Sequence, residues 1–228
     1  MQLLLPVSIN SSQTFDSFIS QSDDVMRQEL NRTILDESFH CIYLAGTQGV
    51  GKTHLLSASC HYAAQHGKST ILLPMEQMID GSTELILGLE EIDLVCIDNI
   101  ELIQGKGEWQ RAIFNLYNAL IQNKSTLLIS ANQTPSQITI ELPDLASRLQ
   151  WATIFQIPQL SEDDKIVALT HHAHLMGFEL SEEVAKFMLS RLPRKMEFLM
   201  QALNTLAKQS IEKQRIVTVP FVKEVLEV

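Results

Sequence analysis

The sequence has few cysteines and no long apolar run, and each shortage excludes a class of protein. Its three cysteines, Cys41, Cys60 and Cys96, lie in apolar or helical stretches without paired spacing, so we expect reduced, buried thiols. No uninterrupted apolar run approaches the ~20 residues of a membrane span, so we expect no membrane-spanning segment and no membrane partner. Internal repeats and low-complexity segments are also missing from the sequence.

Basic residues are also scarce: 17 Lys and Arg stand against 27 Asp and Glu, a net charge of -10. Residues 161–228 hold nine of the basic and ten of the acidic residues, so nine of the ten net negative charges fall in residues 1–160. Proteins that grip duplex DNA through its phosphates usually present a basic face. The composition therefore does not favour direct DNA binding, although the near-neutral C-terminal part leaves room for a local basic patch.

Short apolar runs alternate with longer helical patterns up to Pro158, as in a parallel sheet with crossover helices. Five interleaved strands and helices predict an α/β fold in three layers. The expected strands cover residues 41–46, 70–74, 93–98, 125–130 and 153–157, and the expected helices lie near 22–35, 52–66, 76–89, 108–122 and 141–150.

After Pro158 the pattern becomes entirely helical. Ser161 with Asp164 three residues later predicts a capped helix start, and Pro193 fits the first turn of a later helix. We therefore expect a flexible N-terminal segment, an α/β core and an all-helical lid domain. The expected bounds are 1–13 for the segment, 14–159 for the core and 160–228 for the lid, with lid helices over 161–177, 181–192, 193–214 and 219–228.

The segment GTQGVGKT matches the phosphate-binding pattern G-x-x-x-x-G-K-[ST] at every required position, between an expected strand and an expected helix. Glycines let backbone N–H groups turn toward phosphate oxygens, the lysine can reach the β and γ phosphates, and the threonine hydroxyl can bind Mg²⁺. A chance glycine turn is disfavoured by this context. The predicted nucleotide-binding residues of this P-loop are Gly46, Thr47, Gln48, Gly49, Val50, Gly51, Lys52, Thr53 and His54.

A P-loop needs a carboxylate at the end of a neighbouring strand, and LVCID supplies Asp98 after four apolar residues. Asp98 and Thr53 are therefore the predicted Mg²⁺ ligands. Many ATPases of this type place a glutamate directly after that aspartate to orient the attacking water. This chain has Asn99 there, which cannot accept a proton as a carboxylate can, so we expect binding without efficient hydrolysis.

Several segments in combination resemble the DnaA clade of AAA+ ATPases, and within it the DnaA-homologous regulators of bacterial replication initiation. The resemblance covers nearly the whole chain. Besides the P-loop, it rests on TFDSFI (14–19), CIDNI (96–100), LLISANQTP (127–135), LPDLASRLQW (142–151), LPRKMEFL (192–199) and PFVKEVL (220–226).

The resemblance implies further nucleotide contacts in the core. Phe15 and Phe18 match a segment that leads to the adenine side of the pocket, although a hydrophobic staple for the first helix explains them nearly as well. Asn132 matches the sensor 1 position, whose polar side chain faces the γ-phosphate.

Two arginines also match functional positions of the clade. Arg194 matches the sensor 2 arginine at the start of a lid helix, with Arg191 or Lys195 as alternatives. Arg148 matches the arginine finger that the clade presents to a nucleotide held by a neighbouring subunit, where it can contribute ~10³ to 10⁵ in rate. The alternative for Arg148 is an ion pair with Asp144 on the same helix.

The N-terminal run QLLLP at residues 2–6 resembles a short peptide that binds the DNA polymerase III sliding clamp (the β subunit). Gln2 would make the polar contact, Leu3 and Leu5 would enter the pocket of the clamp, and Pro6 ends the motif. An unpaired edge strand is the alternative.

Together these matches predict a DNA replication inhibitor that binds ADP or ATP with Mg²⁺, with ADP as the expected nucleotide, and has weak or no ATPase activity of its own. It would dock on the DNA-loaded clamp, contact DNA indirectly through it, and supply Arg148 to ATP-bound DnaA. We expect a cytoplasmic, nucleoid-associated protein, with a homo-oligomer left open. The alternative is a self-hydrolysing AAA+ loader or remodelling ATPase that acts on DNA or a helicase.

Overall fold

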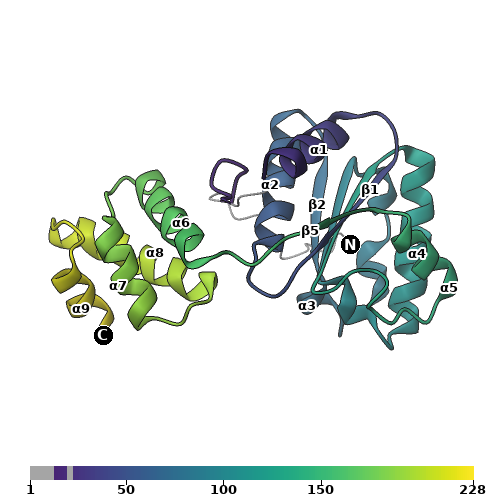
Figure 1. Ribbon diagram of the computed structural model, residues 1–228. Coiled ribbons are helices and arrows are strands. Elements are labelled where there is room, and N and C mark those ends of the chain that lie inside the picture. The colour runs from purple at the N-terminus through teal and green to yellow at the C-terminus, as the bar shows by residue number, and fades with distance from the viewer. Residues whose placement is uncertain (1–12, 20–22) are drawn as a thin grey trace. The chain divides into compact units, whose positions relative to one another are not determined.

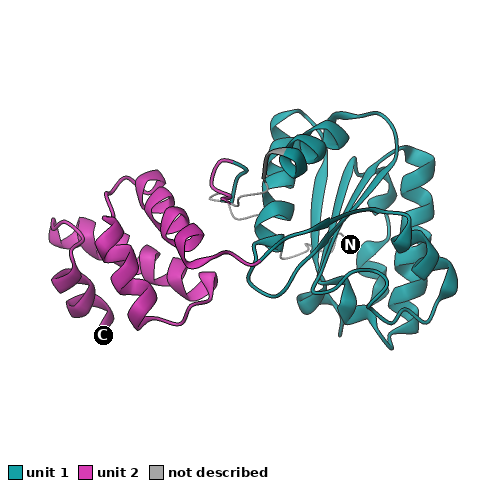
Figure 2. Cartoon of the chain, in the orientation of Figure 1, with its two compact units in different colours: residues 1–15, 22–158 teal, residues 16–21, 159–228 magenta. Residues whose placement is uncertain are grey.

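The computed structural model describes residues 13–19 and 23–228, which form two compact units. Unit 1 holds residues 13–15 and 23–158 of this part, and unit 2 holds residues 16–19 and 159–228 (Figure 2). The predicted clamp-binding residues, Gln2, Leu3, Leu5 and Pro6, lie outside the described residues. No helix in the described part of the chain is long and apolar enough to cross a membrane.

Unit 1 is built on a five-stranded parallel sheet in the order β2-β3-β4-β1-β5. β4 lies between β1 and β3 and runs parallel to both, so the carboxyl ends of these three strands lie side by side at one edge of the sheet. The strands are β1 (His40–Ala45), β2 (Thr70–Pro74), β3 (Leu94–Asp98), β4 (Thr126–Ala131) and β5 (Thr153–Gln156). The five predicted strands are therefore present, each within one residue at either end.

Helices cover both faces of the sheet, which confirms the three-layer α/β prediction. α1 and α2 lie on one face, and α4 and α5 lie on the other (Figure 1). Alternate strand residues such as Tyr43, Ile97 and Ile129 pack with Trp109 and Ile113 of α4 in one buried cluster. The helices are α1 (Asp23–Leu35), α2 (Lys52–Gln65), α4 (Gly107–Asn123) and α5 (Pro143–Gln150).

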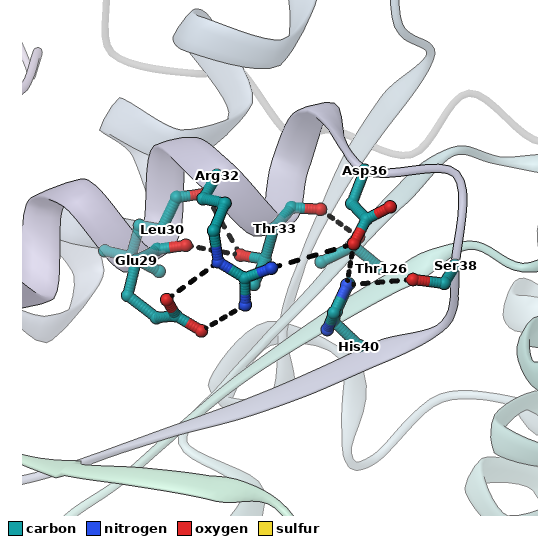
Figure 3. Close-up of polar contacts among 8 residues, drawn as sticks. All are labelled: Glu29, Leu30, Arg32, Thr33, Asp36, Ser38, His40 and Thr126. Carbon is teal, nitrogen blue, oxygen red and sulfur yellow. Dashed lines mark hydrogen bonds and ion pairs between the residues drawn. The ribbon is translucent and has the colours of Figure 1, made fainter.

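Polar contacts hold the C-terminal end of α1 near the start of the central strands (Figure 3). The Arg32 guanidinium lies 2.6 Å from the Glu29 carboxylate and 3.7 Å from that of Asp36. Thr126 Oγ1 donates a hydrogen bond of 3.0 Å to the carbonyl oxygen of Thr33. Exposed ion pairs contribute little, so among these polar contacts the buried Thr126 bond contributes most to holding α1 against β4.

The predicted helix over residues 76–89 is wrong. Short helices replace it: α3 (Met75–Met78) and the 3-10 helices η1 (Thr83–Ile86) and η2 (Leu89–Glu91). Ser82 has an extended backbone and its hydroxyl caps η1, while Gly88 has a φ of 82°. The helical spacing of apolar residues hid these breaks, because a capping serine and a left-handed glycine each end a continuous helix.

Unit 2 is all helical, as predicted, with α6 (Glu162–Leu175), α7 (Glu182–Arg191), α8 (Met196–Lys213) and α9 (Val219–Leu226). Leu169, Met188, Leu203 and Phe221, one from each helix, are fully buried in its core.

One boundary in unit 2 was predicted wrongly. Pro193 is not in the first turn of a helix, because α8 begins at Met196 with Lys195 as its N-cap. Leu192 is extended, with φ -102° and ψ 160°. Helical geometry is disfavoured for the residue that precedes a proline, here Leu192. The chain is therefore extended at Leu192, and α8 starts only at Met196.

The capping box at the start of α6 is confirmed. Ser161 Oγ accepts from the Asp164 backbone N–H at 3.1 Å, and Asp164 Oδ2 accepts from the Ser161 N–H at 3.1 Å. We predict that Ser161→Ala destabilises unit 2 by about 1 kcal/mol, since a first-turn N–H loses its acceptor. Urea unfolding should show this loss. The matched control is Ser190→Ala, whose hydroxyl binds a carbonyl of its own helix, and equal midpoints for the two variants would contradict the prediction.

Candidate functional site

The loop between β1 and α2 requires glycine for two different reasons. Gly49 has a φ of 84° and Gly51 a φ of 99°, in the left-handed region that other residues seldom adopt. A Cβ on Gly46 would lie 2.8 Å from the carbonyl oxygen of Ile157, so no side chain fits there. The loop therefore lies close against the end of β5 and turns its backbone toward α2.

The first turn of α2 is suited to an anion. Its N-cap is Gly51, which offers no side-chain cap, and the first turn holds no acidic residue. Backbone N–H groups at a helix start lack intrahelical acceptors and carry partial positive charge. A phosphate would accept hydrogen bonds from these N–H groups and balance their partial positive charge. The turn of this loop therefore fits the nucleotide that its sequence predicts.

Lys52 places a buried positive charge at this loop, with 6% of its surface exposed. Its Nζ donates to the carbonyl oxygens of Gly46 at 2.6 Å and Thr47 at 3.0 Å, and to Asn132 Oδ1 at 3.0 Å. Burial lowers the pKa of Lys52, and the nearby carboxylate of Glu101 partly offsets that effect. The ammonium thus joins the loop after β1 to the residue after β4.

The two predicted Mg²⁺ ligands lie together. Thr53 Oγ1 donates to Asp98 Oδ2 at 2.7 Å, and the buried hydroxyl of Ser130 donates to Asp98 Oδ1. In the described part of the chain no group of three or more His, Cys, Asp or Glu residues could hold a metal. One hydroxyl and one carboxylate do fit Mg²⁺, which usually takes its other ligands from phosphate and water.

Two residues of this site were missed in the sequence. Ser130 also accepts from the backbone N–H of Asn99 at 2.9 Å, and its position at the end of an apolar strand was the signal. Glu101 lies on the 3-10 helix η3 (Ile100–Ile103). Its Oε1 accepts from the backbone N–H of Asn132 at 3.2 Å, and burial raises its pKa. No local pattern marked Glu101, since no helix was expected there.

Other predicted P-loop residues occupy different positions. Thr47 and Gln48 are exposed, whereas Val50 is buried at 5% exposure. His54 Nε2 lies 2.9 Å from the carbonyl oxygen of Thr14, and burial lowers the pKa of His54. His54 therefore links the start of α2 to the segment before α1.

Phe15 belongs to the same segment and is 7% exposed. Its ring packs edge to face on Tyr62 of α2, with ring centroids 5.8 Å apart. Phe15 thus packs on α2, the helix that follows the P-loop. Phe18 and Arg194 belong to unit 2, not to the unit that holds the P-loop. Arg194 precedes α8, and its guanidinium pairs with the exposed carboxylate of Glu162.

Arg148 lies on α5 between two aromatic rings. Its guanidinium carbon is 5.8 Å from the ring centroid of Tyr117 and 5.8 Å from that of Trp151. Within residues 13–19 and 23–228, Arg148 forms no ion pair with Asp144 or another carboxylate. Trp151 is 77% exposed. The guanidinium is therefore oriented by aromatic faces and keeps its hydrogen-bond donors for another acceptor.

Two known protein families match this chain, one mainly over unit 1 and the other over unit 2. The family described as "Bacterial DnaA ATPase domain" matches residues 9–156, and "Hda, lid domain" matches residues 162–226. Domain III of the Thermotoga maritima replication initiation protein DnaA is similar in fold, with a TM-score of 0.80 and 20% sequence identity. The match covers 97% of this chain and 98% of that chain.

Two further solved structures share the fold. DnaA from Aquifex aeolicus bound to AMPPCP has a TM-score of 0.71 and 19% identity over 91% of this chain and 70% of that chain. The RuvB Holliday junction branch migration motor of Thermotoga maritima has a TM-score of 0.68 and 14% identity over 94% of this chain and 71% of that chain. At these identities the likeness concerns the fold.

Glu101 generates a prediction on stability. A raised folded-state pKa means that the nucleotide-free protein loses stability as the pH rises through that pKa. Glu101→Gln keeps an acceptor for the Asn132 N–H without a buried charge, so it should stabilise the protein by about 1 kcal/mol at pH 8. The gain should shrink as the pH falls through the raised pKa of Glu101. Urea unfolding across this range tests both points, and a gain independent of pH would contradict the titration of Glu101.

Proposed function

Because the chain belongs to the bacterial DnaA ATPase domain family and carries an Hda-like lid, we propose that this DnaA-related replication regulator inactivates DnaA. In this proposal it docks on the DNA-loaded sliding clamp and presents Arg148 to ATP bound by DnaA. Hydrolysis of that ATP then prevents over-initiation. The observation that carries the proposal is the position of Arg148, held by two aromatic rings with no acidic partner among the described residues.

The proposed role of the chain's own nucleotide is to hold the protein in the form that meets DnaA. The first turn of α2 and Lys52 would bind the phosphates, and Thr53 with Asp98 would hold Mg²⁺. Related DnaA structures hold AMPPCP, which supports a nucleotide here. Bound ADP with Mg²⁺ would fill this site and select that form of the protein.

Arginine chemistry suits the proposed role of Arg148. A guanidinium can bind two oxygens of a transferring phosphoryl group and stabilise the charge that develops there. Cation–π contacts orient the side chain at a modest energetic cost of release, about 0.5–1 kcal/mol at an exposed site. A partially buried ion pair would have been harder to leave. Trp151, exposed beside it, provides apolar surface of the kind that recurs at protein interfaces.

The competing function is a self-hydrolysing loader or remodelling ATPase, and this chain is similar in fold to the RuvB branch migration motor. The acidic composition of residues 1–160 disfavours direct work on DNA. We propose that the protein acts in the cytoplasm and reaches the nucleoid through the clamp.

We predict that Arg148→Ala keeps nucleotide and clamp binding but lowers the conversion of DnaA-bound ATP to ADP by about 10³-fold or more. The measurement is a reconstitution of ATP-loaded DnaA, clamp and DNA with each variant, read by the ATP and ADP bound to DnaA. The matched control is Arg32→Ala, whose guanidinium is paired with carboxylates on α1 and beside it (Figure 3). Normal stimulation by Arg148→Ala would remove the arginine-finger role.

A second prediction concerns clamp docking. Gln2→Ala combined with Leu3→Ala should abolish binding to the isolated clamp, because the peptide loses its polar contact and an apolar anchor. The same variant should bind nucleotide normally. Binding to immobilised clamp measures the first effect and titration calorimetry the second. Unchanged clamp affinity would show that another surface does the docking.

A further inference from the structure

A carboxylate that the sequence did not mark as a ligand of nucleotide or Mg²⁺ lies at the carboxyl edge of the sheet. Asn99 follows β3 with a φ of 59°, in the left-handed region, and η3 begins at the next residue. Ser130 Oγ accepts from the backbone N–H of Asn99 at 2.9 Å, so this turn is anchored to β4. The turn brings Glu101 back to the sheet edge, where its Oε1 accepts from the backbone N–H of Asn132 at 3.2 Å.

The second oxygen of this carboxylate carries negative charge that no donor balances. Glu101 Oε2 is buried and has no hydrogen-bond partner among the described residues. A hydrogen-bond donor would offset part of that charge, and solvent would screen it, but neither reaches this oxygen. The charge of Glu101 therefore acts on neighbouring groups with little screening.

Lys52 connects this carboxylate with the phosphate-binding loop. Its Nζ donates to two carbonyl oxygens of the loop on one side and to Asn132 Oδ1 on the other. Burial lowers the pKa of Lys52, and Glu101 opposes that effect more strongly than Asp98 does. Of the two carboxylates, Glu101 therefore acts more strongly on the Lys52 ammonium.

The place of Glu101 relative to the loop determines which phosphate it would oppose. In a P-loop the backbone N–H groups cradle the α and β phosphates, and the lysine reaches the β and γ phosphates. The side of Lys52 that faces the loop therefore serves the β-phosphate, and the side that faces Asn132 is left for the γ-phosphate. Glu101 holds the backbone of that same Asn132. Its charge therefore opposes a γ-phosphate more strongly than a β-phosphate.

We propose that Glu101 makes this site selective for ADP over ATP, because its charge repels a γ-phosphate. With ADP bound, the Asn132 side of Lys52 receives no phosphate, and the ammonium continues to offset the charge of Glu101. ATP adds a further negative charge on that side, against a carboxylate oxygen that no donor balances. Repulsion between like charges in a poorly screened site is sufficient to change an affinity by about tenfold.

This inference rests on nucleotide binding in the proposed function and deepens it, because it names the group that selects the nucleotide. It is independent of Arg148 and of the clamp. It also gives the expected ADP form a physical cause. A chain that disfavours the γ-phosphate keeps ADP when ATP is present, and so keeps the form that is proposed to meet DnaA.

A purely structural role of Glu101 predicts a different result. If Glu101 merely accepts from the Asn132 N–H, Glu101→Gln should change neither affinity, because glutamine keeps an oxygen acceptor on a side chain of the same length. If the substitution damages the site, both affinities should fall. Only the loss of a repulsive charge strengthens binding of the triphosphate while leaving the diphosphate nearly unchanged. The direction of the change therefore separates the three cases.

The experiment is titration calorimetry of the purified full-length chain at pH 8 with Mg²⁺ and either ADP or AMPPCP, a triphosphate analogue that is not hydrolysed between its β and γ phosphates. The wild type should bind ADP more tightly than AMPPCP. Glu101→Gln should bind AMPPCP about tenfold more tightly than the wild type does, with little change for ADP. The matched control is Glu91→Gln, the same change on an exposed residue of η2, which should keep both wild-type affinities.

Three results would overturn the inference: a wild-type chain that binds the two nucleotides equally, a Glu101→Gln variant whose AMPPCP affinity does not rise, or a variant in which both affinities rise alike. Because these titrations contain neither DnaA nor clamp, such a failure leaves the proposed role of Arg148 to its own reconstitution. A wild-type chain that binds neither nucleotide would overturn the inference together with the nucleotide site of the proposed function.

Discussion

The buried ammonium of Lys52 is the interaction about which the candidate site is organised. It lies at the start of α2 and reaches two carbonyl oxygens of its own loop and the side chain of Asn132, which follows the neighbouring strand β4. A buried charge is tolerated only where acceptors surround it. Lys52 therefore constrains the loop after β1 and the residue after β4 to remain close together.

The strand order brings the loop after β1 and the residue after β4 close together. β4 lies between β1 and β3, so residues at the ends of three adjacent strands face one another although they are far apart in sequence. Ser130, the penultimate residue of β4, uses that position to bind both Asp98 and the backbone of Asn99. The order of the sheet thus joins Asp98, the Ser130 hydroxyl and the turn at Asn99 in one hydrogen-bonded group.

The site has more negative than positive charge around its centre. Lys52 is within electrostatic reach of both Asp98 and Glu101. An incoming nucleotide adds phosphate charge, which Mg²⁺ and the start of α2 would offset. Arg148 does not enter this balance: aromatic rings hold it on α5. The fold thereby separates the candidate nucleotide site from the guanidinium of Arg148.

Local residue patterns were sufficient for the strands, for the P-loop and for the capping box of α6, because each depends on neighbours within a few positions. They failed where short-range breaks outweighed apolar spacing, as at Gly88, and where proline delayed α8. Glu101, Ser130 and the contact of Arg148 with the Tyr117 ring were decided by tertiary structure. Their partners lie about 30 residues away in sequence, on other strands and helices, and periodicity carries no information about such contacts.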